Sequence, residues 1–437
     1  MKFTHVVYLL ILLMFSSCVL LLKIHIGSYT PFHLFFFCFI LLVCCFPKAT
    51  IFNQIFRVDA ITLNLLLFIG VILLSYVFNV GEADLVSKNY GSNTGEYPSS
   101  LYIKIAANGL IYASVAFFAY RLGKSYCYED GHFKKICKTI FILCAINAFV
   151  NVVAWLFVTK GVIGRYNFEP PLTFSPGVSI QYSMMGFLLG LPTIYGERNK
   201  LKLKLLYAIQ GILLLSILII LTRQAQLSFL IMYALYVMMT IKLTMKKVLF
   251  VIPFAIIAIG VGMVVLFAAG AFDSYTAINS TESTDVVIRV LMINSAYDLF
   301  LSHPFLGIGY GMFVGHNNVP IVITGVPTYL ASPHNGLAAI VCELGALGVI
   351  TYLILIIIVL KRMSAARKFV ENPIIKRYVT AISVYQVVMV FLFIISNSHL
   401  FGPPSEASYL CMSFISWFLI GAVIAVGRKS SLIKEIA

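Results

Sequence analysis

The sequence predicts an all-α polytopic membrane protein with about twelve transmembrane helices and one long outer loop between the ninth and the tenth. Three observations lead to this fold class. The chain of 437 residues is 61% hydrophobic and only 11% charged, whereas a soluble globular chain is about 25% charged. Apolar segments of membrane-spanning length follow one another along nearly the whole chain. One interruption, residues 271–334, is long for a connection between membrane helices.

About 20 apolar residues in a helix cross the hydrocarbon core of a bilayer. Candidate segments lie at 5–22, 29–46, 60–80, 101–120, 136–158, 178–196, 205–222, 225–241, 248–270, 335–360, 378–397 and 408–427. The second is the weakest, because Pro31 and His33 interrupt it. Only Arg223 and Gln224 separate the seventh from the eighth, which predicts a tight helical hairpin.

The placement of the basic residues predicts the orientation. The formal net charge is +15, but the Lys and Arg residues lie in short clusters between apolar segments, so nucleic-acid binding is not indicated. With the N-terminus in the cytoplasm and twelve crossings, roughly 24 of the 31 basic residues fall in cytoplasmic connections. We therefore expect both termini in the cytoplasm and a single integral membrane domain over 1–437, with the 271–334 loop outside.

The outer loop contains a predicted surface helix. Ser283, Thr284 and Asp285 offer N-cap chemistry before the segment VVIRVLMINSAYDLFL. The apolar residues at 286, 290, 293 and 300 share one face, as in an interfacial amphipathic helix. His303 and Pro304 then end the helix, and a glycine-rich turn, GIGYG, follows.

Three arginines on the outer side are candidate ligands for an anion: Arg165, Arg223 and Arg289. Each has a structural alternative. Arg223 can snorkel to lipid head groups, Arg289 can pair with Asp285 four residues earlier, and Arg165 can anchor its loop. Taken together, they are typical of a site that holds a diphosphate through bidentate hydrogen bonds.

His334 is the candidate for proton transfer. It lies in the sequence SPHNG, where the outer loop meets the tenth apolar segment. An imidazole titrates near ambient pH and can serve as a general base or hydrogen-bond partner for an attacking hydroxyl. The alternative is an interfacial or helix-capping histidine. His303 and His316 are weaker candidates, one at a helix end and one in a Gly/Asn loop.

Glu343 follows His334 by nine residues, which places it near the opposite face of a helix and about 13 Å deeper. An intramembrane carboxylate needs a partner, and we expect an ion pair with Lys104. The GxGxG of GIGYG follows no predicted strand, so a nucleotide loop is not indicated. No DxD, HExxH or outer carboxylate cluster occurs in the sequence, so we expect no metal and no other cofactor.

The order of these motifs resembles the bacterial O-antigen polymerase and O-antigen ligase superfamily. The resemblance rests on the turn HPFLGIGYGMF and on HNGLAAIVCELGALGVI at the start of an apolar segment. LTRQAQLSF and GRYNFEPPLTFSPG are similar to two arginine-containing segments of the same superfamily. The match at LTRQAQLSF is looser, because Gln224 and Gln226 replace the usual small residues.

The resemblance implies a GT-C-like, metal-independent glycosyltransferase of the bacterial inner membrane, active at the periplasmic face and inverting in stereochemistry. It further implies that Arg223, Arg289 and Arg165 hold the diphosphate of an undecaprenyl-diphosphate-linked oligosaccharide. His334 would then deprotonate or orient the acceptor hydroxyl. The bilayer, a chain-length regulator and a flippase are the further partners expected on this resemblance.

Two reactions fit the resemblance. A polymerase moves the growing glycan onto the next lipid-linked repeat unit, whereas a ligase moves it onto lipid A-core. The residues of the two motifs are more similar to those of polymerases of the Wzy type.

A transporter is the alternative from another class of protein, but transporters place charged or broken-helix sites at the bilayer midplane in related halves. This sequence instead gathers its polar features on one outer face.

Overall fold

A computed structural model of the chain describes residues 3–436 except 22, 25–29, 47–57, 87–100, 159–169, 174–175, 221–222, 241–278, 317–320, 324–325, 329–332, 334 and 396–406. The helices are α1 (Phe3–Leu20), α2 (Pro31–Cys45), α3 (Ala60–Phe78), η1 (Val80–Glu82), α5 (Leu101–Tyr126), α6 (Asp130–Phe157), α7 (Pro176–Tyr195), α8 (Lys200–Ile219), α9 (Arg223–Thr240), α12 (Asn279–Ser302), α13 (Phe313–His316), α14 (Gly336–Phe369), α15 (Pro373–Ile395) and α16 (Ala407–Ile436). Within the described ranges, the only strands are β1 (Ile321–Ile323) and β2 (Val326–Thr328), which pair antiparallel.

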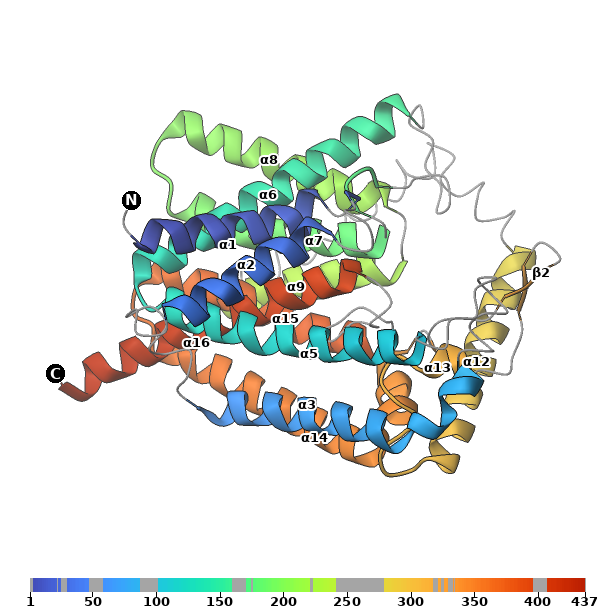
Figure 1. Cartoon of the computed structure of the whole chain (residues 1–437). Helices are drawn as coiled ribbons and strands as arrows, with labels where there is room; N and C mark the ends of the chain where they lie inside the picture. The colour runs from blue at the N-terminus through green and yellow to red at the C-terminus, as the bar shows by residue number, and fades with distance from the viewer. Residues whose placement is uncertain are drawn as a thin grey trace.

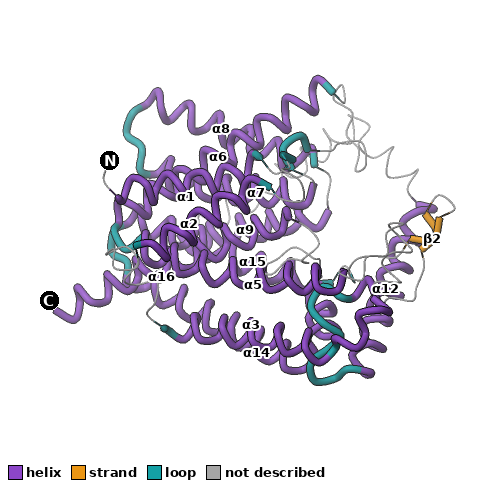
Figure 2. Tube along the Cα trace, in the orientation of Figure 1, coloured by secondary structure: helices purple, strands orange, loops and turns teal. Residues whose placement is uncertain are grey.

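The long helices run side by side in a bundle, and α12 lies across one end of it (Figure 1). The first residues of α1 and the last residues of α16 lie at the opposite end, which we call the terminal end of the bundle (Figure 1). The end that carries α12, α13 and the short hairpin is called the loop end. Figure 2 shows how nearly all of the described chain is helical.

The apolar segments predicted from the sequence are helices wherever the structure describes them; the ninth, 248–270, lies outside the described residues. Of the described helices, seven are long and apolar enough to cross a membrane. Three shorter apolar helices, at Thr4–Leu20, Pro31–Cys45 and Gln226–Thr240, accompany them. The chain is therefore a helical membrane protein, and the number of twelve crossings stays a prediction.

Helix α16 is the centre of the bundle, since 94% of its most apolar window is buried inside the protein. It approaches α5 closely at two glycines. A Cβ atom added at Gly123 would lie 2.0 Å from the carbonyl oxygen of Phe418, and one added at Gly421 would lie 2.1 Å from that of Tyr120. Small residues at such contacts allow helix backbones to pack closely in a membrane, where lipid offers no hydrophobic driving force for association.

The terminal end is tied together by Asp59, the N-cap residue of α3. Its Oδ1 accepts hydrogen bonds from the N–H and the hydroxyl of Thr62, both at 2.8 Å. Its Oδ2 accepts one from the Tyr120 hydroxyl at 2.8 Å and forms an ion pair with Lys124. The start of α3 and the last turns of α5 are thereby joined.

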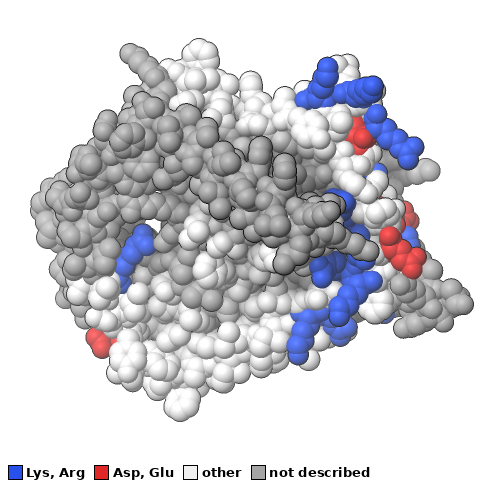
Figure 3. All heavy atoms as spheres, turned by 180° about the vertical axis from the view of Figure 1, so that it is seen from behind, with Lys and Arg blue, Asp and Glu red and all other residues white. Residues whose placement is uncertain are grey.

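The described Lys and Arg side chains gather mainly toward the terminal end, which lies to the right in the rear view of Figure 3. Helix termini that contribute basic residues to this end include those of α5, α14 and α16, which meet around Lys124, Arg362 and Arg428. This distribution agrees with the charge asymmetry read from the sequence and with the positive-inside rule.

The start of helix α12 differs from the start predicted for the helix in the outer loop. It begins at Asn279, so Ser283–Asp285 lie inside it and the predicted N-cap there is wrong. On the predicted interfacial face, Val290 and Ile293 are exposed on the protein surface, by 51% and 42%, and the contact of this face with lipid stays a prediction. A different face, carrying Met292 and Ala296, packs against α14.

Candidate functional site

Of the predicted site residues, the structure describes Arg289 and the backbone of Arg223. Arg289 lies in the first half of α12 and its side chain is half-buried. Arg223 is the first residue of α9, and its side chain is outside the described part of the structure. Arg165 and His334 lie outside the described residues. The structure therefore leaves the convergence of the three arginines and His334 as a prediction.

The two neighbours of His334 are well defined. Pro333 is buried. Asn335 is the N-cap of α14, and its side-chain oxygen accepts a hydrogen bond from the N–H of Ala338 at 2.9 Å. Position 334 is thus the residue directly before the cap, where the chain enters α14 from the outer loop.

Helix α12, which carries Arg289, is fixed to the same part of α14. Met292, one turn after Arg289, and Ala296 form a buried cluster with Phe313 and Cys342. Cys342 lies in the first half of α14, two turns after its N-cap. The helix with the candidate arginine and the helix entered at His334 are therefore held against each other by apolar packing.

Helix α14 is broken at Gly345, whose backbone adopts φ 61° and ψ −162°. At the break, the 303–311 turn replaces the missing helical hydrogen bonds. The N–H groups of Ile308 and Gly309 donate to the carbonyls of Cys342 and Glu343, at 3.0 and 2.9 Å. In the other direction, Ala346 donates to the carbonyl of Pro304 at 2.8 Å.

This break was not expected from the sequence, which predicts one continuous apolar segment over 335–360. A Cβ atom at position 345 would lie 2.5 Å from the carbonyl carbon of Phe305, so only glycine fits. Non-helical backbone within a membrane helix is tolerated where it is buried in protein and its polar groups are paired. The turn after α12 and the first half of α14 therefore form one hydrogen-bonded unit.

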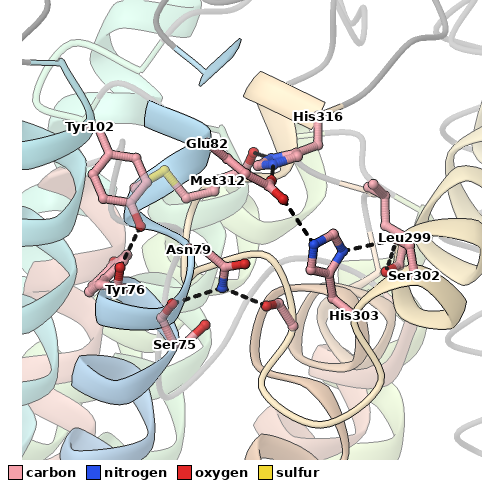
Figure 4. A network of polar contacts seen from close by, with 11 residues as sticks. Ser75, Tyr76, Asn79, Glu82, Tyr102, Leu299, Ser302, His303, Met312 and His316 are labelled. Atoms are coloured by element: carbon pink, nitrogen blue, oxygen red, sulfur yellow. Dashed lines mark hydrogen bonds and ion pairs between the residues drawn. The ribbon is translucent and has the colours of Figure 1, made fainter. Parts of the chain in front are cut away.

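Helix α3 closes this unit from a third side. The Ser75 hydroxyl donates to the carbonyl of Leu306 at 2.6 Å, and the Asn79 amide donates to that of Gly307 at 2.8 Å. The Tyr76 hydroxyl donates to the carbonyl of Tyr310 at 2.5 Å. Figure 4 shows the amide of Asn79, the C-cap residue of α3, between the carbonyl of Ser75 and the turn.

Glu343 is buried at the centre of this unit, with 4% of its surface exposed. Its carboxylate accepts hydrogen bonds from the backbone N–H groups of Phe313, at 3.4 Å, and Gly311. Lys104 is exposed, and no ion pair joins it to Glu343 among the described side chains. The predicted pair is wrong, because the turn brings backbone donors to the carboxylate instead.

A second carboxylate, Glu82 of η1, bridges two histidines of the outer loop (Figure 4). Its Oε1 lies 3.0 Å from Nε2 of His303, and its Oε2 is hydrogen-bonded to Nε2 of His316. The two imidazole rings are 6.5 Å apart, centre to centre. Partial burial raises the pKa of the Glu82 carboxyl, but the hydrogen bonds and charges of His316 and His303 outweigh it and lower the pKa below its ordinary value.

The other ring nitrogens fix the orientation of the two imidazole rings. Nδ1 of His316 is 3.1 Å from the carbonyl oxygen of Met312, which can only accept. Nδ1 of His303 is 2.9 Å from the Ser302 hydroxyl, whose own proton is donated to the carbonyl of Leu299. Both Nδ1 atoms are therefore donors. Both Nε2 atoms face the Glu82 carboxylate, so each imidazole ring is held by hydrogen bonds at both of its nitrogens.

From the sequence, His303 and His316 are only weaker candidates, and Glu82 is not predicted as part of a site. Glu82 and His316 are 234 residues apart, so no local pattern signals their contact. The available signal was an acidic residue just beyond the third apolar segment, on the same predicted side as the two histidines. Among the described residues, no group of three or more His, Cys, Asp or Glu side chains is arranged to hold a metal ion.

Residues 209–353 match the family model described as O-antigen ligase, which supports the resemblance to the O-antigen polymerase and ligase superfamily that the motifs predicted. The match extends from the second half of α8 through α9, α12 and the turn to the middle of α14. It includes Arg223, Arg289 and His334, but not Arg165 or Glu82.

No curated protein gives a significant match to the chain. A solved structure described as "Structural coordination of polymerization and crosslinking by a peptidoglycan synthase complex" is similar over 84% of this chain and 97% of that chain, with 14% sequence identity. Its TM-score of 0.42 is too low for a shared fold to be inferred.

Proposed function

We propose that the protein is a glycosyltransferase that polymerises lipid-linked oligosaccharide repeat units at the outer face of the inner membrane. The donor would be a glycan on undecaprenyl diphosphate, and the acceptor would be the next repeat unit. The observation that carries this proposal is the packing of α12 on the first half of α14, next to the turn that fills the break at Gly345. This packing holds the helix of Arg289 against the helix that begins after His334.

In the proposed reaction, Arg289, Arg223 and Arg165 bind the diphosphate of the donor through charge-assisted hydrogen bonds. His334 accepts the proton of the attacking hydroxyl as its oxygen bonds to the anomeric carbon. The bond from that carbon to the phosphate oxygen breaks, and its electron pair leaves with the lipid diphosphate. Arginine charge stabilises this leaving group, and attack from the opposite side inverts the anomeric configuration.

The surrounding charge distribution supports the same orientation. The described basic side chains lie mainly at the terminal end (Figure 3), which the positive-inside rule assigns to the cytoplasm. The loop end would then face the periplasm, where lipid-linked repeat units are used. The same proposal places both termini in the cytoplasm.

Ligation is the second candidate, because the matched family is described as O-antigen ligase. Purified full-length protein incubated with a lipid-linked repeat unit alone separates the two. A ladder of glycan lengths is expected for the polymerase. No product until lipid A-core is added would identify a ligase, and no product with either acceptor would contradict both.

Variants at two positions test the proposed roles in the same assay. His334→Ala is expected to lower the rate about 10²- to 10⁴-fold, the range of general acid–base catalysis. His132→Ala, at the terminal end, is the matched control and should leave the rate unchanged. Arg289→Ala should be far more damaging than Asp285→Ala. If the two variants lost the same amount of activity, the role of Arg289 would be limited to an ion pair with Asp285.

A further inference from the structure

The terminal end contains a cavity of about 390 Å³ whose charged lining residues are all basic. It lies where the ends of α7, α9 and α14 meet the start of α15. The basic residues that line it are Arg367, Lys368, Lys376 and Arg377. Glu371, in the connection between α14 and α15, is exposed and is not part of the lining. A cavity of this kind favours an anion with several oxygen atoms.

Arg377 is held in a defined position by an aromatic ring. Its guanidinium lies 3.7 Å from the centre of the Tyr195 ring, at the end of α7. Stacking restrains a guanidinium while its N–H groups remain directed in the plane, where they can bind phosphate oxygens in pairs. The cavity therefore includes a pre-positioned group as well as flexible lysines.

A second cavity, of about 230 Å³, shares Met239 and Arg367 with the first. It continues along the helices between α9, α14 and α15, and its lining is mainly apolar: Leu235, Leu360, Met363, Val384 and Val387. A basic cavity at the helix ends therefore adjoins an apolar crevice between the same helices. Free phosphate would use only the first of these spaces.

From these two adjoining cavities we infer a binding site for an anionic phospholipid of the leaflet at the terminal end. The phosphate group binds among the four basic residues, and one acyl chain lies in the crevice. Juxtamembrane basic groups attract anionic lipids, and burial of the chain adds the hydrophobic contribution. A zwitterionic head group is disfavoured, because its cation would lie beside four positive side chains. This site is separate from the loop end and does not depend on the proposed glycosyltransferase activity.

The test is native mass spectrometry of the full-length protein in detergent with added phosphatidylglycerol, phosphatidylcholine or inorganic phosphate. Retention of phosphatidylglycerol, but not of phosphatidylcholine, is expected for the unaltered protein. The double variant Arg367→Gln/Arg377→Gln should bind phosphatidylglycerol roughly tenfold to thirtyfold more weakly. Lys202→Gln/Lys204→Gln, which removes the same charge from exposed positions on α8, should change binding less than about twofold.

The crevice is tested separately by Ser364→Trp, because Ser364 is exposed and lines only the apolar cavity. This change should reduce phosphatidylglycerol retention and leave all four basic residues in place. Equal retention of phosphatidylglycerol and phosphatidylcholine by the unaltered protein would by itself overturn the proposal. If inorganic phosphate displaced phosphatidylglycerol completely and Ser364→Trp left retention unchanged, the cavity would be an anion site that binds no lipid. Equal losses in the two charge variants would mean unspecific surface attraction.

Discussion

At the residue scale, Glu82 is the clearest example of a side chain whose importance depends on distant partners. It accepts hydrogen bonds from two histidines that frame the turn at the loop end. In Glu82→Gln, one oxygen is replaced by an N–H donor, so one histidine loses its acceptor. Hydrogen bonds to charged groups contribute about 1.5–3 kcal/mol.

We therefore expect Glu82→Gln to lower the melting temperature and to increase hydrogen exchange in residues 303–316. Asp84→Asn is the matched control, since Asp84 is exposed and lies two residues away. If exchange in 303–316 were the same in both variants, Glu82 would not anchor the turn.

Asp59 leads to a prediction about pH. Partial burial raises the pKa of this carboxyl, but hydrogen bonds from Lys124, Thr62 and Tyr120 outweigh it and lower the pKa from 3.8 to about 2. A carboxyl with a lowered pKa stabilises the fold fully above its ordinary pKa, and this stabilisation is lost as the pH falls toward 2. The shift corresponds to about 2 kcal/mol.

Asp59→Asn should accordingly lower the melting temperature at pH 7 and reduce its further decrease between pH 4 and pH 2.5. Asp130→Asn serves as the control, because Asp130 is 47% exposed and its pair with Lys429 is 3.5 Å long, a kind that contributes little. An identical pH profile for Asp59→Asn and the unaltered protein would contradict the proposed role of the carboxylate.

At the scale of elements, the break in α14 is the feature most sensitive to substitution. Gly345 has a positive φ, and a Cβ atom would collide with the backbone of Phe305. Backbone strain of this type costs about 1–3 kcal/mol, and the collision adds to it. Gly345→Ala is therefore expected to lower the melting temperature clearly and to reduce any activity of the loop end.

Gly70→Ala is the appropriate comparison, because Gly70 is also in a membrane helix but has open space around its Cβ position. Alanine there should be neutral or stabilising by up to about 1 kcal/mol. The idea that α14 requires its break would be untenable if Gly345→Ala behaved like Gly70→Ala.

Helix positions could be predicted from the sequence because each apolar segment carries its own signal, independent of tertiary contacts. The break could not, since Gly345 lies among apolar residues and only the turn at 303–311 makes the non-helical conformation favourable. The same limit applied to α12. Its apolar residues were recognised, but the choice of Met292 and Ala296 for packing depends on Phe313 and Cys342.

At the scale of the whole molecule, the orientation is open to direct test. A reporter fused after Asn93 or after Thr284 should respond to the outer compartment, and one fused after Lys429 to the cytoplasm. The physical reason is the concentration of basic residues at the terminal end (Figure 3). A cytoplasmic response at Asn93 or Thr284 would overturn the orientation and, with it, the proposed periplasmic site.

For the candidate site, the sequence predicts a region and a family resemblance but not the arrangement of the side chains. Residues 209–353 carry motifs that can be read locally. The bridge between Glu82 and the histidines cannot be read in this way, because it depends on how α3 packs beside α14. Charge patterns and short motifs are properties of segments, whereas this bridge is a property of the assembled bundle.

The broken helix also has a consequence for biosynthesis. Ser75 and Asn79 enter the membrane early, but their partners in the turn are made about 230 residues later, and the turn is completed by α14 only when Ala346 and Leu347 have emerged. Until then, these polar groups on α3 lack their final acceptors. Contacts so distant in sequence form slowly. The loop end therefore stays unassembled until the first half of α14 has been made, and a chain truncated before Leu347 would lack the backbone groups that close the turn.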